Sequence, residues 1–221
     1  MIPSGAKIRV VGDVHGDIKG FSAACATDRF ILQLGDLVDE GPDSAGVLRL
    51  MFDVIDHGRG GFLLGNHERK LGRWLYGENV RPGPALEATR ATLDAALIER
   101  TLLELDRAPL WIGYHSYFFV HAAFHRAMLT QNPPPGLGPT TPLLSRALFG
   151  QVVSGRKADG YPERVLNWVG HIPQDLRVFC GHDQRSNDGR PYVVRNDLGG
   201  EAVFLDTGAG KGGHLSWIDL D

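Results

Sequence analysis

One pattern recurs six times along the 221-residue chain and constrains its fold more than any other feature. An apolar segment, usually ending in glycine, is followed at once by residues that can ligate a metal ion. The six segments read VVGDVHG, LQLGDLVD, FLLGNHE, FFVHAA, VFCGHD and VFLDTG. Side chains just past the carboxyl ends of neighbouring strands converge on one crevice of an α/β protein. The repetition therefore predicts an α/β fold whose functional site lies at the ends of its strands.

The residues that follow these segments are acids, imidazoles and an amide, with no thiol among them. They are Asp13, His15, Asp36, Asp39, Asn66, His67, Glu68, His121, His182 and Asp206. This mixture suits borderline metals such as Mn, Fe or Zn better than a cysteine-bound structural zinc. Taken singly, each position has an ordinary explanation, because a lone histidine is more often hydrogen-bonded in a core. Their joint occurrence favours two metal ions that share a bridging carboxylate.

The rest of the sequence alternates short apolar runs with helical periodicity, as α/β proteins do. Strands are expected at residues 7–11, 30–34 and 61–64, and helices at 18–27, 42–58, 67–78 and, in one or two pieces, 84–107. A hairpin is expected over 109–120, and RVFCGH, AVFLDTG and GHLSWIDL are expected to form antiparallel strands near the end of the chain. The Pro/Gly loop from Thr130 to Pro142 is long enough for a lid or substrate rim, or is a plain surface loop.

Composition limits the partners and the location. With 43% hydrophobic and 22% charged residues, the chain is an ordinary globular protein, and its length suits a single domain over residues 1–221. A net charge of -3 gives no general attraction to nucleic acid or anionic membrane. Cys25 and Cys180 favour buried thiols in a reducing compartment over a disulfide. Without a visible signal peptide or membrane span, we expect a cytoplasmic protein with no membrane association and no obligate protein partner.

The motifs GDVHG, GDLVDEG, GNHE, VHAA and CGH resemble those of the calcineurin-like metallophosphoesterases. Within that superfamily they are similar to the branch of the PPP-type Ser/Thr protein phosphatases and their small phage and bacterial relatives. The segments GNHERKLGRWLYGENV and LDTGAGKGGHLS also resemble the phosphatase module of bacterial polynucleotide kinase-phosphatases. The resemblance runs from Asp13 to about Gly213. It implies two mixed β-sheets packed face to face with helices outside, and two divalent transition metals, Mn foremost, with Fe or Zn as alternatives.

The resemblance also implies a role for each matching residue. Asp13 and His15 would hold the first ion, and Asp36 would bridge both ions. The remaining ligands of the second ion would be Asn66, His121 and His182.

The same resemblance implies an acid for the leaving group. Asp39 would orient His67 and keep it protonated, so that the imidazole donates to the leaving oxygen. Asp206 would support a metal ligand from behind.

One position departs from the family pattern. Close relatives have arginine directly after the second aspartate, where it grips the substrate phosphate, and this chain has Glu40 there. The arginines that could compensate are Arg69, Arg73, Arg156 and Arg185. Alternatively, Glu40 turns outward or pairs with one of them, or the substrate is a singly charged diester.

The implied reaction is hydrolysis of a phosphomonoester by metal-activated water. A PPP-like phosphatase acting on phosphorylated protein is the leading expectation. A nucleotide or RNA-end phosphatase, or a 2′,3′-cyclic phosphodiesterase, would act instead on a nucleotide or nucleic-acid substrate. A dinucleoside-tetraphosphate hydrolase is less favoured, because such enzymes usually replace the acid at Asp39 and tend to read GNHD. An inactive module that binds phosphorylated ligands rests on Glu40 alone.

Overall fold

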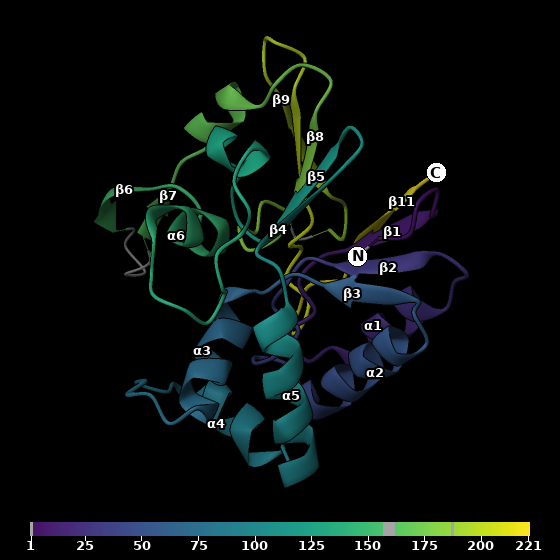
Figure 1. The fold of residues 1–221 in the computed structure, drawn as a ribbon, viewed down its shortest axis with the longest axis vertical. Helices are drawn as coiled ribbons and strands as arrows, with labels where there is room; N and C mark the ends of the chain where they lie inside the picture. Colours follow the sequence, from purple (N-terminus) through teal and green to yellow (C-terminus); the bar gives the residue numbers. More distant parts are fainter. Residues whose placement is uncertain (1, 157–161, 187) are drawn as a thin grey trace.

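Two mixed β-sheets face each other in the computed structural model, which describes residues 2–156, 162–186 and 188–221 (Figure 1). The first sheet has the order β11–β1–β2–β3. Its strands are β1 (Ile8–Val11), β2 (Phe30–Gln33), β3 (Gly60–Phe62) and β11 (Trp217–Leu220). The first three run parallel, and β11 pairs antiparallel with β1. Three parallel strands bring three ligand motifs to the same edge.

The second sheet has the order β4–β5–β8–β10–β9. Its strands are β4 (Trp111–Tyr114), β5 (Tyr117–Val120), β8 (Arg177–Cys180), β9 (Tyr192–Arg195) and β10 (Glu201–Phe204). The expectation that RVFCGH and AVFLDTG are antiparallel is wrong, because β5, β8 and β10 run parallel. The sequence pattern did not reveal β9, which reverses the chain between β8 and β10. The parallel order lets His182 and Asp206 leave the sheet at one edge.

The facing surfaces of the two sheets form an apolar layer. It contains Ile8, Val10, Leu32, Leu34 and Leu63 from the first sheet, and Phe119, Phe179, Val203 and Leu205 from the second. The rings of Phe119 and Phe179 stack with their centroids 5.5 Å apart. This layer confirms the predicted fold of two sheets packed face to face with helices outside.

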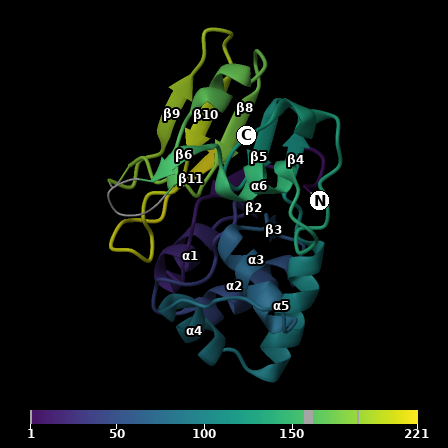
Figure 2. The ribbon, with the colours of Figure 1, turned by 90° about the vertical axis from the view of Figure 1, so that its left-hand side faces the viewer.

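Most helices lie on the far side of the first sheet (Figure 2). These are α1 (Ile18–Cys25), α2 (Ser44–Asp56), α3 (Asn66–Leu75), α4 (Pro84–Ala91) and α5 (Ala95–Arg107). The predicted helical stretch 84–107 is indeed in two pieces, because Asp94 begins α5 by accepting a hydrogen bond from the backbone N–H of Leu97 at 2.8 Å. The polar cap therefore decides where the second helix starts.

The second sheet is covered by shorter elements. They are the 3₁₀ helices η1 (Arg126–Leu129) and η2 (Asn167–His171), the helix α6 (Pro142–Phe149), and a hairpin of β6 (Val152–Arg156) and β7 (Pro162–Arg164). Within the described part of the chain, no helix is both long enough and apolar enough to cross a membrane. Cys25 and Cys180 are buried and free, as the sequence predicts.

Candidate metal centre

The six ligand motifs converge where the two sheets meet. Asp13 follows β1, Asp36 follows β2 and Asn66 begins α3 after β3, all in the first sheet. From the second sheet, the residues that follow β5, β8 and β10 are His121, His182 and Asp206. All of them except His121 line a crevice of about 690 Å³. His121 is completely buried beneath it.

Glycine allows the backbone to approach closely at this edge. A Cβ atom on Gly181 would lie 1.8 Å from Oδ1 of Asp13, and one on Gly35 would lie 2.7 Å from Nδ1 of His121. The space is instead filled by the carboxylate of Asp13, which accepts a hydrogen bond from the backbone N–H of His182 at 2.9 Å. The motif glycines are therefore required by the packing of one ligand against the next.

Backbone strain is concentrated in the same place. Among the described residues, seven non-glycine positions have left-handed φ angles. Five of them belong to the ligand motifs or follow them directly: His15, Asp36, Asp39, Glu40 and His182. Such conformations persist only where the surrounding structure enforces them, and they are typical of functional sites.

Glu68 is the residue that enforces the turn after β2. Its buried carboxylate accepts four backbone hydrogen bonds, through Oε2 from Asp36 at 2.7 Å and Gly65 at 3.2 Å, and through Oε1 from Leu37 at 2.8 Å and Val38 at 3.1 Å. The acid of the GNHE motif therefore holds Asp36 in place from below and takes no part in lining the crevice.

Two imidazoles have their tautomer set by a carbonyl group. Nδ1 of His15 donates to Val38 O at 3.1 Å, and Nδ1 of His121 donates to Leu34 O at 2.9 Å. Nε2 of each ring consequently carries a lone pair. Nε2 of His121 lies 3.0 Å from Oδ1 of Asn66 and 3.4 Å from Oδ1 of Asp36. Nε2 of His121 and the Oδ1 atoms of Asn66 and Asp36 are all lone-pair donors, so a bound cation would stabilise their close approach.

His182 gives independent support for a metal ion. Its Nε2 atom is buried and has no hydrogen-bond partner among the described residues. A buried polar atom without a partner is costly unless something absent from the protein chain satisfies it. Burial lowers the pKa of His182 well below its usual value and that of His15 to about 4, so both rings are neutral, as metal ligands must be.

Asp36 is shared by two groups of potential ligands. One contains His15, Asp36 and His67, and the other contains Asp36, His121 and His182, with ligand atoms in each group within 4.8 Å of one another. Burial opposes ionisation of Asp36, but neighbouring positive charge, which in this site comes from the protonated His67, holds its pKa well below the usual range. A carboxylate common to two groups is what a pair of bridged ions requires.

Asp13 and Asp206 add negative charge beside the first group. Burial raises the pKa of both, and for Asp13 the charges of Asp206 and Asp36 raise it further. Oδ2 of Asp13 lies 3.9 Å from Nε2 of His15. Three buried carboxylates this close together need compensating cations. The residues present therefore fit divalent metal ions.

His67 differs from the other imidazoles in partner and exposure. Its Nδ1 atom is 2.7 Å from Oδ2 of Asp39, and its side chain is 23% exposed, whereas those of His15 and His121 are at most 1% exposed. Burial lowers the pKa of His67, but Asp36 and the hydrogen bond to Asp39 outweigh this and raise it to about 9. A cationic, accessible imidazole is suited to donate a proton.

Asp39 is in turn held by two hydroxyl groups that the sequence patterns did not reveal. The hydroxyl of Thr89, on α4, donates to Oδ1 of Asp39 at 2.7 Å. Ser44 accepts from the backbone N–H of Asp39 at 2.9 Å, and its Oγ is 3.1 Å from Oγ1 of Thr89. These contacts orient the acid that orients His67.

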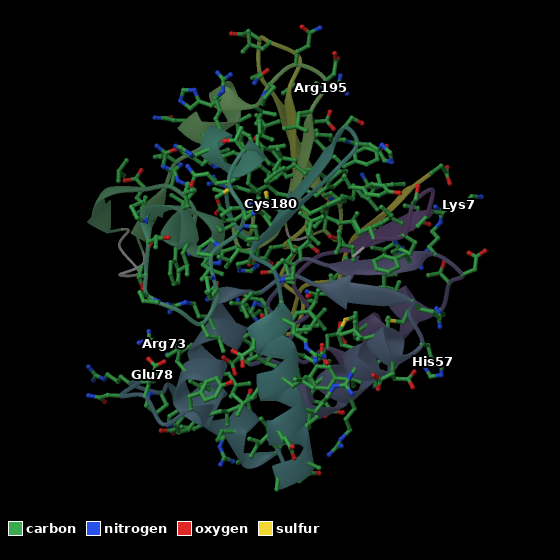
Figure 3. The ribbon with its side chains drawn as sticks, viewed as in Figure 1. Lys7, His57, Arg73, Glu78, Cys180 and Arg195 are labelled. Carbon is green, nitrogen blue, oxygen red and sulfur yellow. The ribbon has the colours of Figure 1, made fainter. Side chains whose placement is uncertain are left out.

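The arginines proposed to compensate for Glu40 are not among the described residues that line the crevice. Arg73 forms an ion pair with Glu78 at 2.6 Å, at the far end of α3 (Figure 3). Arg185 pairs with Asp183 through its Nε at 2.9 Å. The side chain of Arg156 lies outside the described part of the structure. Glu40 itself is exposed, lines the crevice and forms no ion pair within the described residues.

Arg69 has a different partner, the Pro/Gly loop from Thr130 to Pro142. It donates to the carbonyl groups of Gly136 at 2.9 Å and Gly138 at 2.8 Å. No residue of this loop is among those that line the crevice. The structure therefore gives no support to a lid or substrate rim at this loop. The rim is formed instead by residues 83–86, at the start of α4.

Three other cations line the crevice, Lys70, Arg164 and Lys211, and the sequence analysis missed the last two. None forms an ion pair with a carboxylate within the described residues, although six acids line the same crevice. Nε of Arg164 is buried and has no described hydrogen-bond partner. The position of Lys70, three residues after His67 on α3, was the signal available in the sequence. Arg164 follows no ligand motif, whereas Lys211 lies five residues after Asp206 of the VFLDTG motif.

The family described as "Calcineurin-like phosphoesterase" matches residues 6–186. The chain belongs to this family. It is accordingly a hydrolase of phosphoric esters, and the family implies divalent metal ions, which the His and Asp groups described above can hold.

Known proteins similar to this phosphoesterase include the asymmetrical bis(5′-nucleosyl)-tetraphosphatase PrpE of Halalkalibacterium halodurans. It is 27% identical over 94% of this chain and 87% of its own length. The structure of a candidate diadenosine tetraphosphatase covers 100% of this chain and 95% of its own, at 21% identity and a TM-score of 0.66. The structure of a Ser/Thr protein phosphatase from Saccharomyces cerevisiae, with similarity to human PP5, covers 98% of this chain and 80% of its own. Its sequence identity is 15%, and its TM-score is 0.63. The two structures share the fold.

Proposed function

We propose that this phosphoesterase hydrolyses dinucleoside tetraphosphates with asymmetric cleavage, by means of two divalent metal ions. The observation that carries the proposal is a set of three cations that line the crevice without an ion pair to any described carboxylate: Lys70, Arg164 and Lys211. A monoester brings one phosphate, whereas a polyphosphate brings a negative charge with each phosphate and needs more cations to hold it. Relatives with this activity in their names match over nearly the whole chain.

The proposed ligands are those that the sequence predicts. Asp13 and His15 would hold the first ion, and Asp36 would be shared by both ions. Asn66, His121 and His182 would complete the second ion. When bound, the two ions would supply an activated water and charge stabilisation for the phosphoryl group. Manganese remains the metal expected first, with iron and zinc as alternatives.

His67 is the proposed general acid. Its Nδ1 contacts Asp39, so the proton available to a substrate is on Nε2, which lies 3.8 Å from Oδ2 of Asp36 and faces the crevice. Asp39 fixes the ring orientation, and the hydroxyl of Thr89 fixes Asp39. Asp206 supports the loop beyond it by accepting from the N–H of Gly208 at 3.0 Å.

A second candidate is the PPP-like protein phosphatase expected first from the sequence. The feature that favours it is the intact pair of Asp39 and His67, together with the reading GNHE. Glu40 argues against ranking the protein phosphatase first, because an acid then stands where the phosphate of a phosphopeptide would bind. A single domain over residues 1–221, a cytoplasmic location and the lack of an obligate protein partner remain predictions.

The test is a comparison of initial rates on protein stripped of metal and reloaded with Mn²⁺, with chelated protein as the control. The substrates are a dinucleoside tetraphosphate, a phosphoserine peptide, p-nitrophenyl phosphate and bis-p-nitrophenyl phosphate. We expect the highest kcat/KM on the tetraphosphate, with nucleoside mono- and triphosphate as the products resolved by anion exchange. A higher kcat/KM on the peptide would overturn the proposal in favour of the protein phosphatase.

A further inference from the structure

Lys211 is presented by a closed glycine loop between β10 and β11. The backbone N–H groups of Lys211 and Gly213 both donate to Gly208 O, at 3.1 and 2.9 Å. The N–H of His214 donates to Thr207 O at 3.2 Å and closes the base of the loop. Lys211 therefore lies on a turn that its own hydrogen bonds define.

This loop is packed directly on the first ligand motif. A Cβ atom on Gly210 would lie 2.2 Å from the carbonyl oxygen of His15, so only glycine permits this approach. The result is that Nζ of Lys211 lies 3.1 Å from Nε2 of His15. Residues almost 200 positions apart in sequence are thus brought into contact, and a flexible lysine is aimed at the floor of the crevice.

The contact with His15 leaves the lysine available to a substrate. Because Nδ1 of His15 donates to Val38 O, Nε2 offers a single lone pair. The ammonium group of Lys211 cannot retain that lone pair once a metal ion takes it. The charge of Lys211 reaches Asp13 and Asp206, where it opposes the rise of their pKa, but neither carboxylate is within ion-pair distance of Lys211. The three ammonium protons therefore remain available to an acceptor in the crevice.

Two cations of the crevice can be placed relative to the proposed metal ligands. Lys211 contacts the imidazole of His15, and Arg164 is a second cation of the same lining. A scissile phosphoryl group would be bound at the proposed metal ligands, most of which line this crevice. The phosphates on either side of it in a polyphosphate chain would then extend towards these cations.

We propose that Lys211 binds a non-scissile phosphate of the substrate and so selects a polyphosphate chain over a simple monoester. This inference rests on the proposed function, since it assigns a specificity residue to the same site. In a monoester there is no second phosphate for Lys211 to reach. A charge-assisted hydrogen bond from Lys211 is expected to tighten polyphosphate binding by about tenfold or more.

The experiment compares wild type, Lys211→Met, Lys211→Arg and the matched surface control Lys19→Met, all loaded with Mn²⁺. Calorimetry measures binding of a methylene-bridged analogue of inorganic tripolyphosphate, which is not hydrolysed. Bound metal is counted by mass spectrometry. KM and kcat are measured for a dinucleoside tetraphosphate and for p-nitrophenyl phosphate.

We expect Lys211→Met to weaken analogue binding and raise KM for the tetraphosphate by about tenfold. Its metal content should stay within about twofold of wild type, and its kcat/KM for p-nitrophenyl phosphate should fall much less than its kcat/KM for the tetraphosphate, because this substrate has no second phosphate for Lys211 to bind. Lys211→Arg should restore most of the analogue affinity, and Lys19→Met should behave as wild type.

Unchanged analogue affinity in Lys211→Met would overturn the assignment. So would tighter metal binding in that variant with no loss of analogue affinity, since Lys211 would then be a competitor of the metal ion. If wild type fails to hydrolyse the tetraphosphate while Lys211→Met still loses analogue affinity, the proposed function fails and the phosphate-binding role of Lys211 stands.

Discussion

Replacing Glu68 by glutamine tests whether this acid holds the metal-bridging turn. In wild type, its two carboxylate oxygens accept the N–H groups of Asp36, Leu37, Val38 and Gly65. Glutamine has nearly the same shape, but one of its two terminal groups is an amide NH₂. That group would face two backbone N–H donors, so two buried donors would lose their partners.

The size of the effect follows from these contacts. A buried donor without a partner costs about 1–3 kcal/mol, so two of them lower the free energy of unfolding by about 2–6 kcal/mol. For a chain of this length, that corresponds to a fall in Tm of roughly 5–20 °C. Because Asp36 is one of the released residues, we also expect weaker metal binding.

The assay is urea denaturation followed by circular dichroism, in chelator so that metal binding does not add to stability. Metal content after reloading is measured in parallel. The matched control is Glu99→Gln, at an exposed position of α5, which should change the free energy of unfolding by about 0.5 kcal/mol or less. A Glu68→Gln protein as stable as this control, with full metal content, would refute the role assigned to Glu68.

Three further outcomes are expected. His67→Ala should lower kcat about 10²–10⁴-fold with metal content near normal, and an unaltered kcat would remove it as the general acid. Asp36→Asn should lose bound metal as well as activity, and full retention of two ions by mass spectrometry would contradict a bridging role. Phe179→Ala should lower the free energy of unfolding by about 3–5 kcal/mol in urea, because this fully buried ring stacks on Phe119 between the sheets, and a loss below about 1 kcal/mol would show that the layer repacks.

Much of the architecture could be predicted because the chemistry is local. Each ligand follows a strand directly, so recognising the strand also locates the side chain. The family motifs then imply how the two sheets face each other. Strand direction was harder, since RVFCGH and AVFLDTG look the same whether parallel or antiparallel. Only the strand Tyr192–Arg195, which the sequence analysis overlooked between the two motifs, decides between them.

The cations of the crevice could not be predicted for a related reason. Arg164 lies at the end of a two-stranded hairpin, and Lys211 lies in a glycine loop packed on His15, so the direction of each side chain depends on tertiary packing. Conversely, Arg69 looked available for substrate because it follows GNHE directly. Its guanidinium turns the other way, into the carbonyl groups of the loop after Thr130. Sequence position alone does not report which side of a helix a long side chain takes.

The pairing of β11 with β1 has a consequence for synthesis of the chain. Ile8 lies opposite Leu220 and Val11 opposite Trp217, and Arg9 grips Asp219 with two hydrogen bonds of 2.7 and 2.9 Å. During translation β1 leaves the ribosome long before its partner, so one edge of the first sheet stays unpaired for most of the process and is open to other nascent chains. Asp13 sits at the end of that strand. The antiparallel pairing of β11 with β1 therefore also completes the sheet that positions the first ligand motif.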